Sequence, residues 1–407
     1  MVLSADFFVI LAFYIWAVFS FVSNSLLSLH HVCILLVLLY SKKFFQNPIK
    51  PRWSIVFLFF LGVAASLSVF FNWSILEQPL KSLLKTKYFF FSAFSAWFVS
   101  RSPLTVQKNW PNISAIFLLS FTAANIYGIV IWFYKTFILK ITGLRLGGFF
   151  GMELSYSNMA FYPLFLLLYF LLFKQEGSFR KEIQSKTLKL IHSQKVYILM
   201  LFIGFLALYL SKSRGAIIAF LIAVPVLLFY KNKKIFYGSL LFSAITVSFW
   251  LFLSLQGSST NRLFLSLNSD NAKQRIAQAT TAWHGFLENP IFGEGYRALQ
   301  QRDRYFKDKY DIPYKNFNEH AHNSFLEILA STGLVGFLCF LLFWFFWLRE
   351  ILMTSSMWGK GFFIASIFAS LIAGLFQSTI IDSEVVFTLF ALFGVSHAFI
   401  KVPTKEM

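Results

Sequence analysis

Long apolar runs recur along almost the whole chain, and they restrict its fold more than any other feature of the sequence. Of the 407 residues, 57% are hydrophobic and only 13% are charged, which is more apolar surface than a water-soluble fold could bury. The hydrocarbon core of a bilayer offers no water to backbone N–H and C=O groups, so apolar segments of this length must be helices. The sequence therefore predicts an all-α polytopic membrane protein with about 12 transmembrane helices.

The apolar runs have lengths close to the roughly 20 residues that one crossing of a bilayer requires. They lie at 6–23, 25–40, 53–71, 86–100, 113–134, 158–173, 196–211, 214–230, 235–256, 324–348, 361–381 and 383–399. This pattern predicts three parts: transmembrane helices 1–9 in residues 1–256, a large, partly helical loop at 257–323, and transmembrane helices 10–12 in residues 324–407. The connections near 23–26 and 211–214 are so short that hairpins or a re-entrant segment also fit them.

Basic residues give the chain a formal net charge of +19, and most of them lie in short loops between apolar runs. This scattered arrangement does not indicate nucleic-acid binding; it is typical of the positive-inside rule and of contact with anionic membrane lipids. The basic loops at 41–52, 174–195 and 231–234 fall on the same side of the membrane. With that side cytoplasmic, both termini are cytoplasmic, and the loop at 257–323 faces the periplasm from the inner membrane of a bacterium.

Sequence motifs for nucleotides and metals are missing. The chain has no P-loop, no dinucleotide-binding glycine fingerprint and no cluster of His, Cys, Asp or Glu at metal-ligand spacing. We therefore expect neither a cofactor nor a bound metal. The energy for any group transfer must then come from the substrate itself.

Two cations lie between adjacent apolar runs, in the segment Ser211-Lys212-Ser213-Arg214-Gly215. Charges at membrane depth are unfavourable, which makes them candidates for function. A guanidinium group offers a planar pair of donors that matches phosphate oxygens, so Arg214, with Lys212 beside it, is a candidate anion ligand. The alternative is an interfacial arginine whose charge reaches back to water.

An amphipathic segment follows within the large polar loop. The spacing from Arg275 to Trp283 predicts a helix lying on the membrane face, and Pro290 with Gly293 and Gly295 predicts the turn that ends it. A helix on the solvated surface of the protein fits the same pattern.

A third group of polar residues precedes the tenth apolar run. The group consists of His320, His322, Asn323 and Glu327, and the run itself contains Gly333 and Gly336. A histidine at this place can accept a proton from a hydroxyl, and small residues allow close helix approach. The alternative is a histidine that only caps or packs against a helix.

At these residues the sequence resembles the superfamily of O-antigen ligases and O-antigen polymerases, which are glycosyltransferases of the bacterial envelope. Its signature is a histidine, a small amide or hydroxyl residue, nine free positions, a glycine, two free positions and a small residue, and it is met by His322, Asn323, Gly333 and Gly336. Further matches are Arg214-Gly215, Arg275 followed by Trp283, Gly293 and Gly295, and Arg145 followed by Asn158. The pattern is most similar to that of the O-antigen ligases.

The resemblance implies transfer of an undecaprenyl-diphosphate-linked glycan at the outer face of the inner membrane, without metal or nucleotide. It implies that Arg214 and Arg275 bind the donor diphosphate, while His322 acts as general base on the acceptor hydroxyl, with inversion at the anomeric centre. The remaining matched and neighbouring residues would support this site: Arg145, Lys212, Gly215, Trp283, Gly293, Gly295, His320, Asn323, Glu327, Gly333 and Gly336.

The identity of the acceptor separates two members of this superfamily. A ligase transfers the glycan to lipid A-core, and we expect this reaction. A polymerase, the alternative, transfers it to a growing lipid-linked glycan. A glycolipid flippase without catalysis is a further alternative, because it would also place cations and a histidine in an outward-facing cavity.

Overall fold

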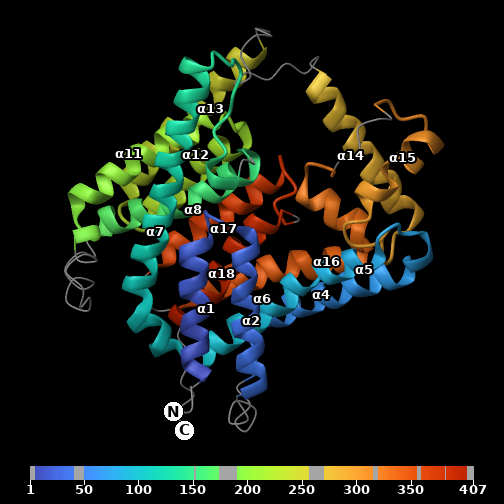
Figure 1. The fold of residues 1–407 in the computed structure, drawn as a ribbon, viewed down its shortest axis with the longest axis horizontal. Helices are drawn as coiled ribbons and strands as arrows, with labels where there is room; N and C mark the ends of the chain where they lie inside the picture. Colours follow the sequence, from blue (N-terminus) through green and yellow to red (C-terminus); the bar gives the residue numbers. More distant parts are fainter. Residues whose placement is uncertain are drawn as a thin grey trace.

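The computed structural model describes residues 5–40, 50–150, 153–173, 190–255, 270–314, 320–354, 359–380 and 382–400, and within these ranges its regular elements are all helices (Figure 1). The helices that coincide with the predicted apolar runs are α1 (Ala5–Phe19), α2 (Asn24–Tyr40), α4 (Trp53–Phe71), α6 (Lys87–Arg101), α7 (Pro103–Phe133), α8 (Glu153–Phe173), α11 (Gln194–Leu210), α12 (Arg214–Phe229), α13 (Lys233–Leu255), α16 (Ser324–Met353), α17 (Lys360–Gly374) and α18 (Ser383–Phe399). Three further helices lie outside these runs: α5 (Pro79–Lys85), α14 (Asp270–Glu288) and α15 (Leu299–Lys309). The all-α prediction is confirmed for the described residues.

Four helical stretches in these ranges are long and apolar enough to cross a membrane. They are Trp53–Phe71, Pro103–Ile138, Leu154–Phe173 and Ser324–Met353. Shorter apolar helices accompany them, α1, α12 and α18 among them. The chain is therefore a membrane protein, as its apolar runs predict. The number of crossings stays a prediction.

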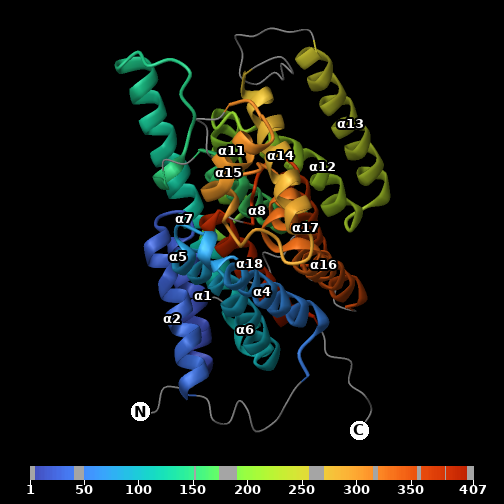
Figure 2. The same ribbon diagram turned by 90° about the vertical axis from the view of Figure 1, so that its right-hand side faces the viewer.

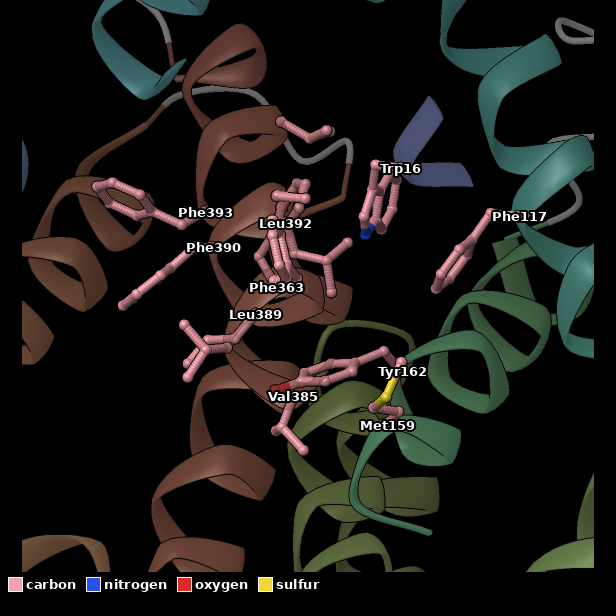
Figure 3. Close-up of a cluster of buried hydrophobic side chains, with 14 of the residues drawn as sticks. Trp16, Phe117, Met159, Tyr162, Phe363, Val385, Leu389, Phe390, Leu392 and Phe393 are labelled. Carbon is pink, nitrogen blue, oxygen red and sulfur yellow. The ribbon is translucent and has the colours of Figure 1, made fainter. Parts of the chain in front are cut away.

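Aromatic rings fill the interior between the helices. Trp16 of α1 stacks on Phe117 of α7 with ring centroids 4.6 Å apart (Figure 3). Phe393 of α18 meets Phe343 of α16 edge to face at 5.2 Å. Lipid tails are as apolar as these side chains, so close packing holds membrane helices together more than the hydrophobic effect does. The contacts between these rings therefore hold the helices of the bundle together.

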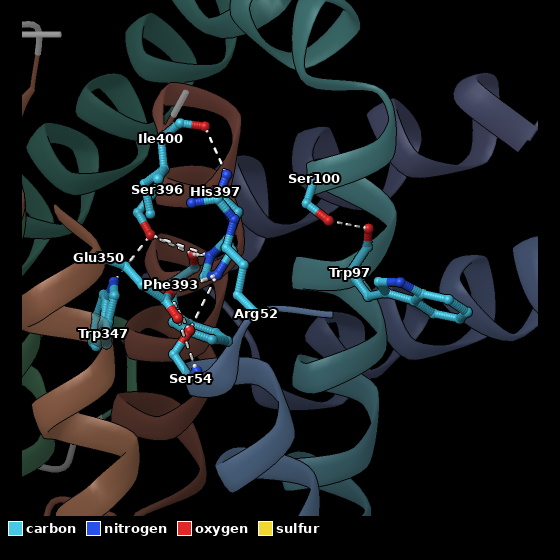
Figure 4. Close-up of polar contacts among 10 residues, drawn as sticks. All are labelled: Arg52, Ser54, Trp97, Ser100, Trp347, Glu350, Phe393, Ser396, His397 and Ile400. Atoms are coloured by element: carbon cyan, nitrogen blue, oxygen red, sulfur yellow. Dashed lines mark hydrogen bonds and ion pairs between the residues drawn. The ribbon is translucent and has the colours of Figure 1, made fainter. Parts of the chain in front are cut away.

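A polar cluster joins the start of α4 to the ends of α16 and α18 (Figure 4). The backbone N–H of Ser54 donates to Glu350 Oε1 at 3.1 Å, and Glu350 Oε2 lies 3.6 Å from His397 Nε2. Arg52 Nη2 donates to the carbonyl oxygen of Ile400 at 2.8 Å. These contacts fix the C-terminal end of α16, opposite the polar residues at its start.

Helix α16 is broken at Gly333, whose backbone (φ 63°, ψ −165°) lies outside the helical range. The segment 290–295, which follows α14, fills the break. Main-chain hydrogen bonds run from Glu294 to Ala330 at 2.8 Å, from Gly295 to Ser331 at 3.1 Å, from Leu334 to Pro290 at 2.8 Å and from Val335 to Ile291 at 3.2 Å. Non-helical backbone at membrane depth is tolerated only where other protein groups satisfy its hydrogen bonds, and here this segment supplies them.

Two glycines permit this close approach of backbones. A Cβ on Gly333 would lie 2.3 Å from the carbonyl oxygen of Ile291, and a Cβ on Gly293 would lie 2.5 Å from the nitrogen of Gly333. Both glycines also have positive φ, at 63° and 71°, where other residues are strained. The two positions therefore serve to dock the polar loop into α16.

Helices α14 and α15 lie together at one end of the bundle, away from the end where α1 begins (Figures 1 and 2). A small apolar cluster joins them to the start of α16. It consists of Ala282 in α14, Leu299 in α15, and Ala321 and Ala330 in and before α16. This packing holds α14 over the start of α16.

The break at Gly333 makes a first prediction. A Gly333→Ala substitution should lower the melting temperature of the detergent-purified protein, because the new Cβ clashes with Ile291 and the backbone conformation alone costs about 1–3 kcal/mol in a residue other than glycine. The matched control is Gly238→Ala in α13, where a Cβ meets nothing within 4 Å. Equal melting temperatures for the two variants would contradict the docking role of Gly333.

Candidate active site

A cavity of about 310 Å³ lies where α12, α14 and α16 begin and where α17 ends. It brings together Arg214, Arg275 and His322, which lie far apart in the sequence. The other lining residues are Gly215, Ile218, Asn271, Ala272, Ile276, Ala279, Ala321, Asn323, Leu326, Leu375 and Phe376. The cavity therefore combines two guanidinium groups and one imidazole with several apolar side chains.

A smaller cavity of about 40 Å³ adjoins the first and shares Arg214 and Arg275 with it. Arg145 and Lys212 also line this smaller cavity, together with Asn158. Arg275 and Arg145 both act electrostatically on Arg214. Like charges gathered in this way repel one another, and an anion bound between them would relieve the repulsion.

Local backbone structure explains how the cations converge. Arg214 is the first residue of α12, so the positive end of the helix dipole adds to its charge. Arg275 leans from α14 onto the turn after α17, where its Nη1 donates to the carbonyl oxygen of Phe376 at 3.3 Å. Gly215 allows that turn to come near, because a Cβ there would lie 2.9 Å from Phe376 Cβ. Leu146, next to Arg145, donates its N–H to Leu210 of α11 at 3.2 Å.

His322 is held in a defined orientation. Its Nδ1 lies 3.1 Å from Gln377 Oε1. An amide oxygen only accepts, so the tautomer that makes this hydrogen bond has its proton on Nδ1 and leaves Nε2 able to accept a proton. The backbone of His322 has a positive φ of 50°. Asn323 stabilises this turn: its Oδ1 accepts from Phe325 N at 2.9 Å, and its Nδ2 donates to Leu375 O at 3.2 Å.

Glu327 and His320 also lie at the turn that carries His322. The carboxylate of Glu327 is fully buried and accepts a hydrogen bond from the backbone N–H of Ala321 at 2.8 Å. His320 Nδ1 lies 4.0 Å from the other oxygen of Glu327. Neither residue lines the cavity, and Glu327 contacts the segment that carries His322 through Ala321.

Residues 199–341 match the family model described as O-antigen ligase. The resemblance drawn from the sequence motifs is thereby confirmed over this segment, which contains Arg214, Arg275 and His322. O-antigen ligases and polymerases transfer glycans and act on lipid-linked substrates. Arg145 lies before the matched segment, yet the fold brings it to the same cations. No curated protein matches the chain in sequence.

Some residues that the motifs of the O-antigen ligases singled out lie outside both cavities. Trp283 of α14 is 46% exposed and contacts Phe286, with ring centroids 5.4 Å apart. Gly293, Gly295 and Gly333 form the docked break in α16 and do not line the cavities. Gly336 belongs to the same region, where an added Cβ would meet the side chain of Thr332.

The turn between α17 and α18 was not expected at this site. The run 361–381 predicts one continuous helix, but α17 ends at Gly374, and the next residues turn toward α12 and α16. Leu375 and Phe376 line the larger cavity, and Gln377 orients His322. The hydrogen bond from Ser324 Oγ to Gln377 O, at 3.0 Å, holds the turn against α16.

Asp382 follows this turn and is partly buried beside it. Burial and the nearby carboxylate of Glu384 raise the pKa of Asp382, while His320 and Arg297 act in the opposite direction. Ser155 Oγ donates to Asp382 Oδ2 at 3.4 Å. The residue therefore joins the turn to α8 and to the segment before α16.

The convergence of cations makes a second prediction. Inorganic pyrophosphate should bind the purified protein, and Arg214→Gln and Arg275→Gln should each weaken its affinity about tenfold or more, because one charge-assisted hydrogen bond contributes about 1.5–3 kcal/mol. Isothermal titration gives the affinities. Arg304→Gln is the control, because this arginine of α15 has a side chain that is 72% exposed and pairs with Asp308. Equal affinities in all four proteins would rule out anion binding at the cluster.

Proposed function

We propose that the chain transfers an undecaprenyl-diphosphate-linked O-antigen glycan to lipid A-core at the periplasmic face of the bacterial inner membrane. The proposal rests on one observation: Arg214, Arg275 and His322 line one cavity, inside the segment that matches the O-antigen ligases. It includes about 12 membrane crossings, the division at 256/257 and 323/324, and a periplasmic position for α14 and α15.

The reaction needs two things from the protein, a base for the acceptor hydroxyl and positive charge at the leaving group. The acceptor hydroxyl attacks the anomeric carbon of the donor glycan and forms the new glycosidic bond, while Nε2 of His322 takes the hydroxyl proton. The bond from the anomeric carbon to the diphosphate oxygen breaks, and undecaprenyl diphosphate leaves with both electrons. Arg214 and Arg275 offset the negative charge that grows on this leaving group.

Inversion requires these groups to act from opposite sides of the bound sugar. The arginines hold the leaving group on one side of the sugar, and His322 delivers the hydroxyl from the other side. In-line attack then inverts the configuration at the anomeric carbon. The four cations at the two cavities supply the charge that a metal supplies in many phosphate-transferring enzymes.

A polymerase would use the same chemistry and differ only in its acceptor. Deletion in the native bacterium separates the two reactions: loss of a ligase leaves free lipid A-core together with full-length lipid-linked polymer, and loss of a polymerase leaves single-repeat products. A flippase would move the lipid-linked glycan without forming a glycosidic bond, so product formation by purified protein excludes it.

His322→Ala should lower glycan transfer about 100-fold or more, because general-base catalysis typically supplies that factor. The assay uses purified protein, a defined polyprenyl-diphosphate donor and lipid A-core as acceptor. The variant should remain in the membrane at normal abundance, since His322 lies at a turn and not in the packed interior. Activity within about tenfold of the unmodified protein would remove His322 from the role of base.

The two arginines should act on one leaving group. Lysine keeps the charge but loses the planar pair of donors, so Arg214→Lys and Arg275→Lys should each reduce kcat/KM for the donor about tenfold or more. The double variant should be little worse than the worse single variant, because residues that act as a unit are non-additive. Arg304→Lys, on the exposed face of α15, should have no effect. Fully additive losses would show that the arginines act on separate groups.

A further inference from the structure

A second polar cavity, of about 410 Å³, lies between α5 and the start of α15. Its lining residues are Glu77, Gln78, Lys81, Ser82, Lys85, Arg297, Gln300 and Gln301. Each of them is charged or polar, and none lines the cavity that contains His322. The composition suits a hydrophilic ligand that carries negative charge.

Hydrogen bonds across the cavity hold its two walls together. Gln301 Nε2 donates to Ser82 Oγ at 3.1 Å, and the backbone N–H of Gln78 donates to Gln301 Oε1 at 3.0 Å. Gln301 belongs to α15, whereas Gln78 and Ser82 lie at α5, more than 200 positions earlier in the chain. These hydrogen bonds fix the two sides of the cavity relative to each other, where the start of α15 meets α5.

Arg297 is placed at this cavity by a strained backbone. Its φ of 60° is a left-handed conformation that residues other than glycine rarely adopt, and such positions cluster at functional sites. The preceding residue keeps it there: Tyr296 is buried, and its N–H donates to Ser68 Oγ of α4 at 3.0 Å.

The cations of the cavity repel one another. Burial lowers the pKa of Lys85, and the positive charges of Arg297, Lys87 and Lys81 lower it further, against the opposite effect of Glu384. Glu77 also contributes a carboxylate to the lining. Three cationic side chains and one carboxylate therefore line one cavity, and an anion that bound there would reduce the repulsion among the cations.

The cavity is electrostatically linked to the candidate active site. The buried carboxylate of Glu327 interacts electrostatically with both Arg297 and His322, and it accepts a hydrogen bond from the backbone N–H of Ala321 at 2.8 Å. Asp382 likewise interacts with both Arg297 and His320. A molecule in the second cavity would thus lie next to the segment that carries the proposed base.

We propose that this cavity binds an anionic sugar of the acceptor, one that bears a phosphate or carboxylate group, and so directs an acceptor hydroxyl toward His322. The proposal rests on the proposed glycan transfer. Lys81, Lys85 and Arg297 bind the anionic group, and the amides of Gln300 and Gln301 bind sugar hydroxyls. A phospholipid headgroup offers the same phosphate chemistry, since Lys81 and Lys85 also border a hollow lined by Leu80 and Leu84.

Binding of glucose 6-phosphate tests the cavity directly. The full chain, in nanodiscs of phosphatidylcholine, should bind glucose 6-phosphate and not glucose in saturation-transfer NMR. Lys85→Gln and Arg297→Gln should each weaken binding about tenfold or more. The exposed-residue control Lys108→Gln should leave it unchanged. Unchanged binding with both Lys85→Gln and Arg297→Gln, or an equal loss with Lys108→Gln, would overturn the proposal.

Two further experiments complete the test. One distinguishes a sugar phosphate from a lipid headgroup, and the other distinguishes failure of this proposal from failure of the proposed function. Nanodiscs of phosphatidylglycerol should not displace glucose 6-phosphate; displacement would identify a lipid headgroup as the ligand and contradict a sugar site. In the transfer assay, Lys85→Gln should raise KM for a phosphorylated acceptor about tenfold with little change in kcat, and it should not affect a dephosphorylated acceptor. Absence of transfer by the unmodified protein would refute the proposed function, while the NMR result still decides whether the cavity binds an anionic sugar.

Discussion

Main-chain hydrogen bonds between the segment 290–295 and the broken helix α16 are the contacts on which the candidate active site depends. They fix the end of α14 against a helix whose far end is tied to α4 and α18. Arg275, near the start of α14, then lines one cavity with His322 and Arg214. The glycines that permit this contact do not line the cavity, and they influence the position of Arg275 through the backbone.

The candidate active site combines mutually repelling arginines with an oriented histidine. Arg145 and Arg275 act on Arg214 with like charge, and only a strongly anionic group compensates several cations at once. His322 is oriented separately, by Gln377 at Nδ1 and by the capping side chain of Asn323. The proposed reaction needs both features: the arginines would stabilise the charge of the diphosphate leaving group, and His322 would accept the proton of the incoming hydroxyl.

The sequence predicted the helices well because bilayer-length apolar runs leave the backbone no alternative. It also pointed to Arg214, Arg275 and His322, since these residue types at membrane borders are costly without a function. It did not reveal the turn after Gly374, because apolar residues continue on both sides of Gln377 and the run reads as one helix. Nor did it reveal the cavity at Arg297, whose walls are joined by Gln78 and Gln301 from distant parts of the chain.

The central claim is that Arg214 and Arg275 hold one diphosphate while His322 faces the anomeric carbon. An experimental structure of the full chain with a non-cleavable polyprenyl-diphosphate glycan tests it most directly. We predict phosphate oxygens within about 3 Å of both guanidinium groups, and His322 Nε2 on the opposite side of the anomeric carbon, within reach of an incoming hydroxyl. A diphosphate bound by one arginine alone, or in a cavity without His322, would contradict it.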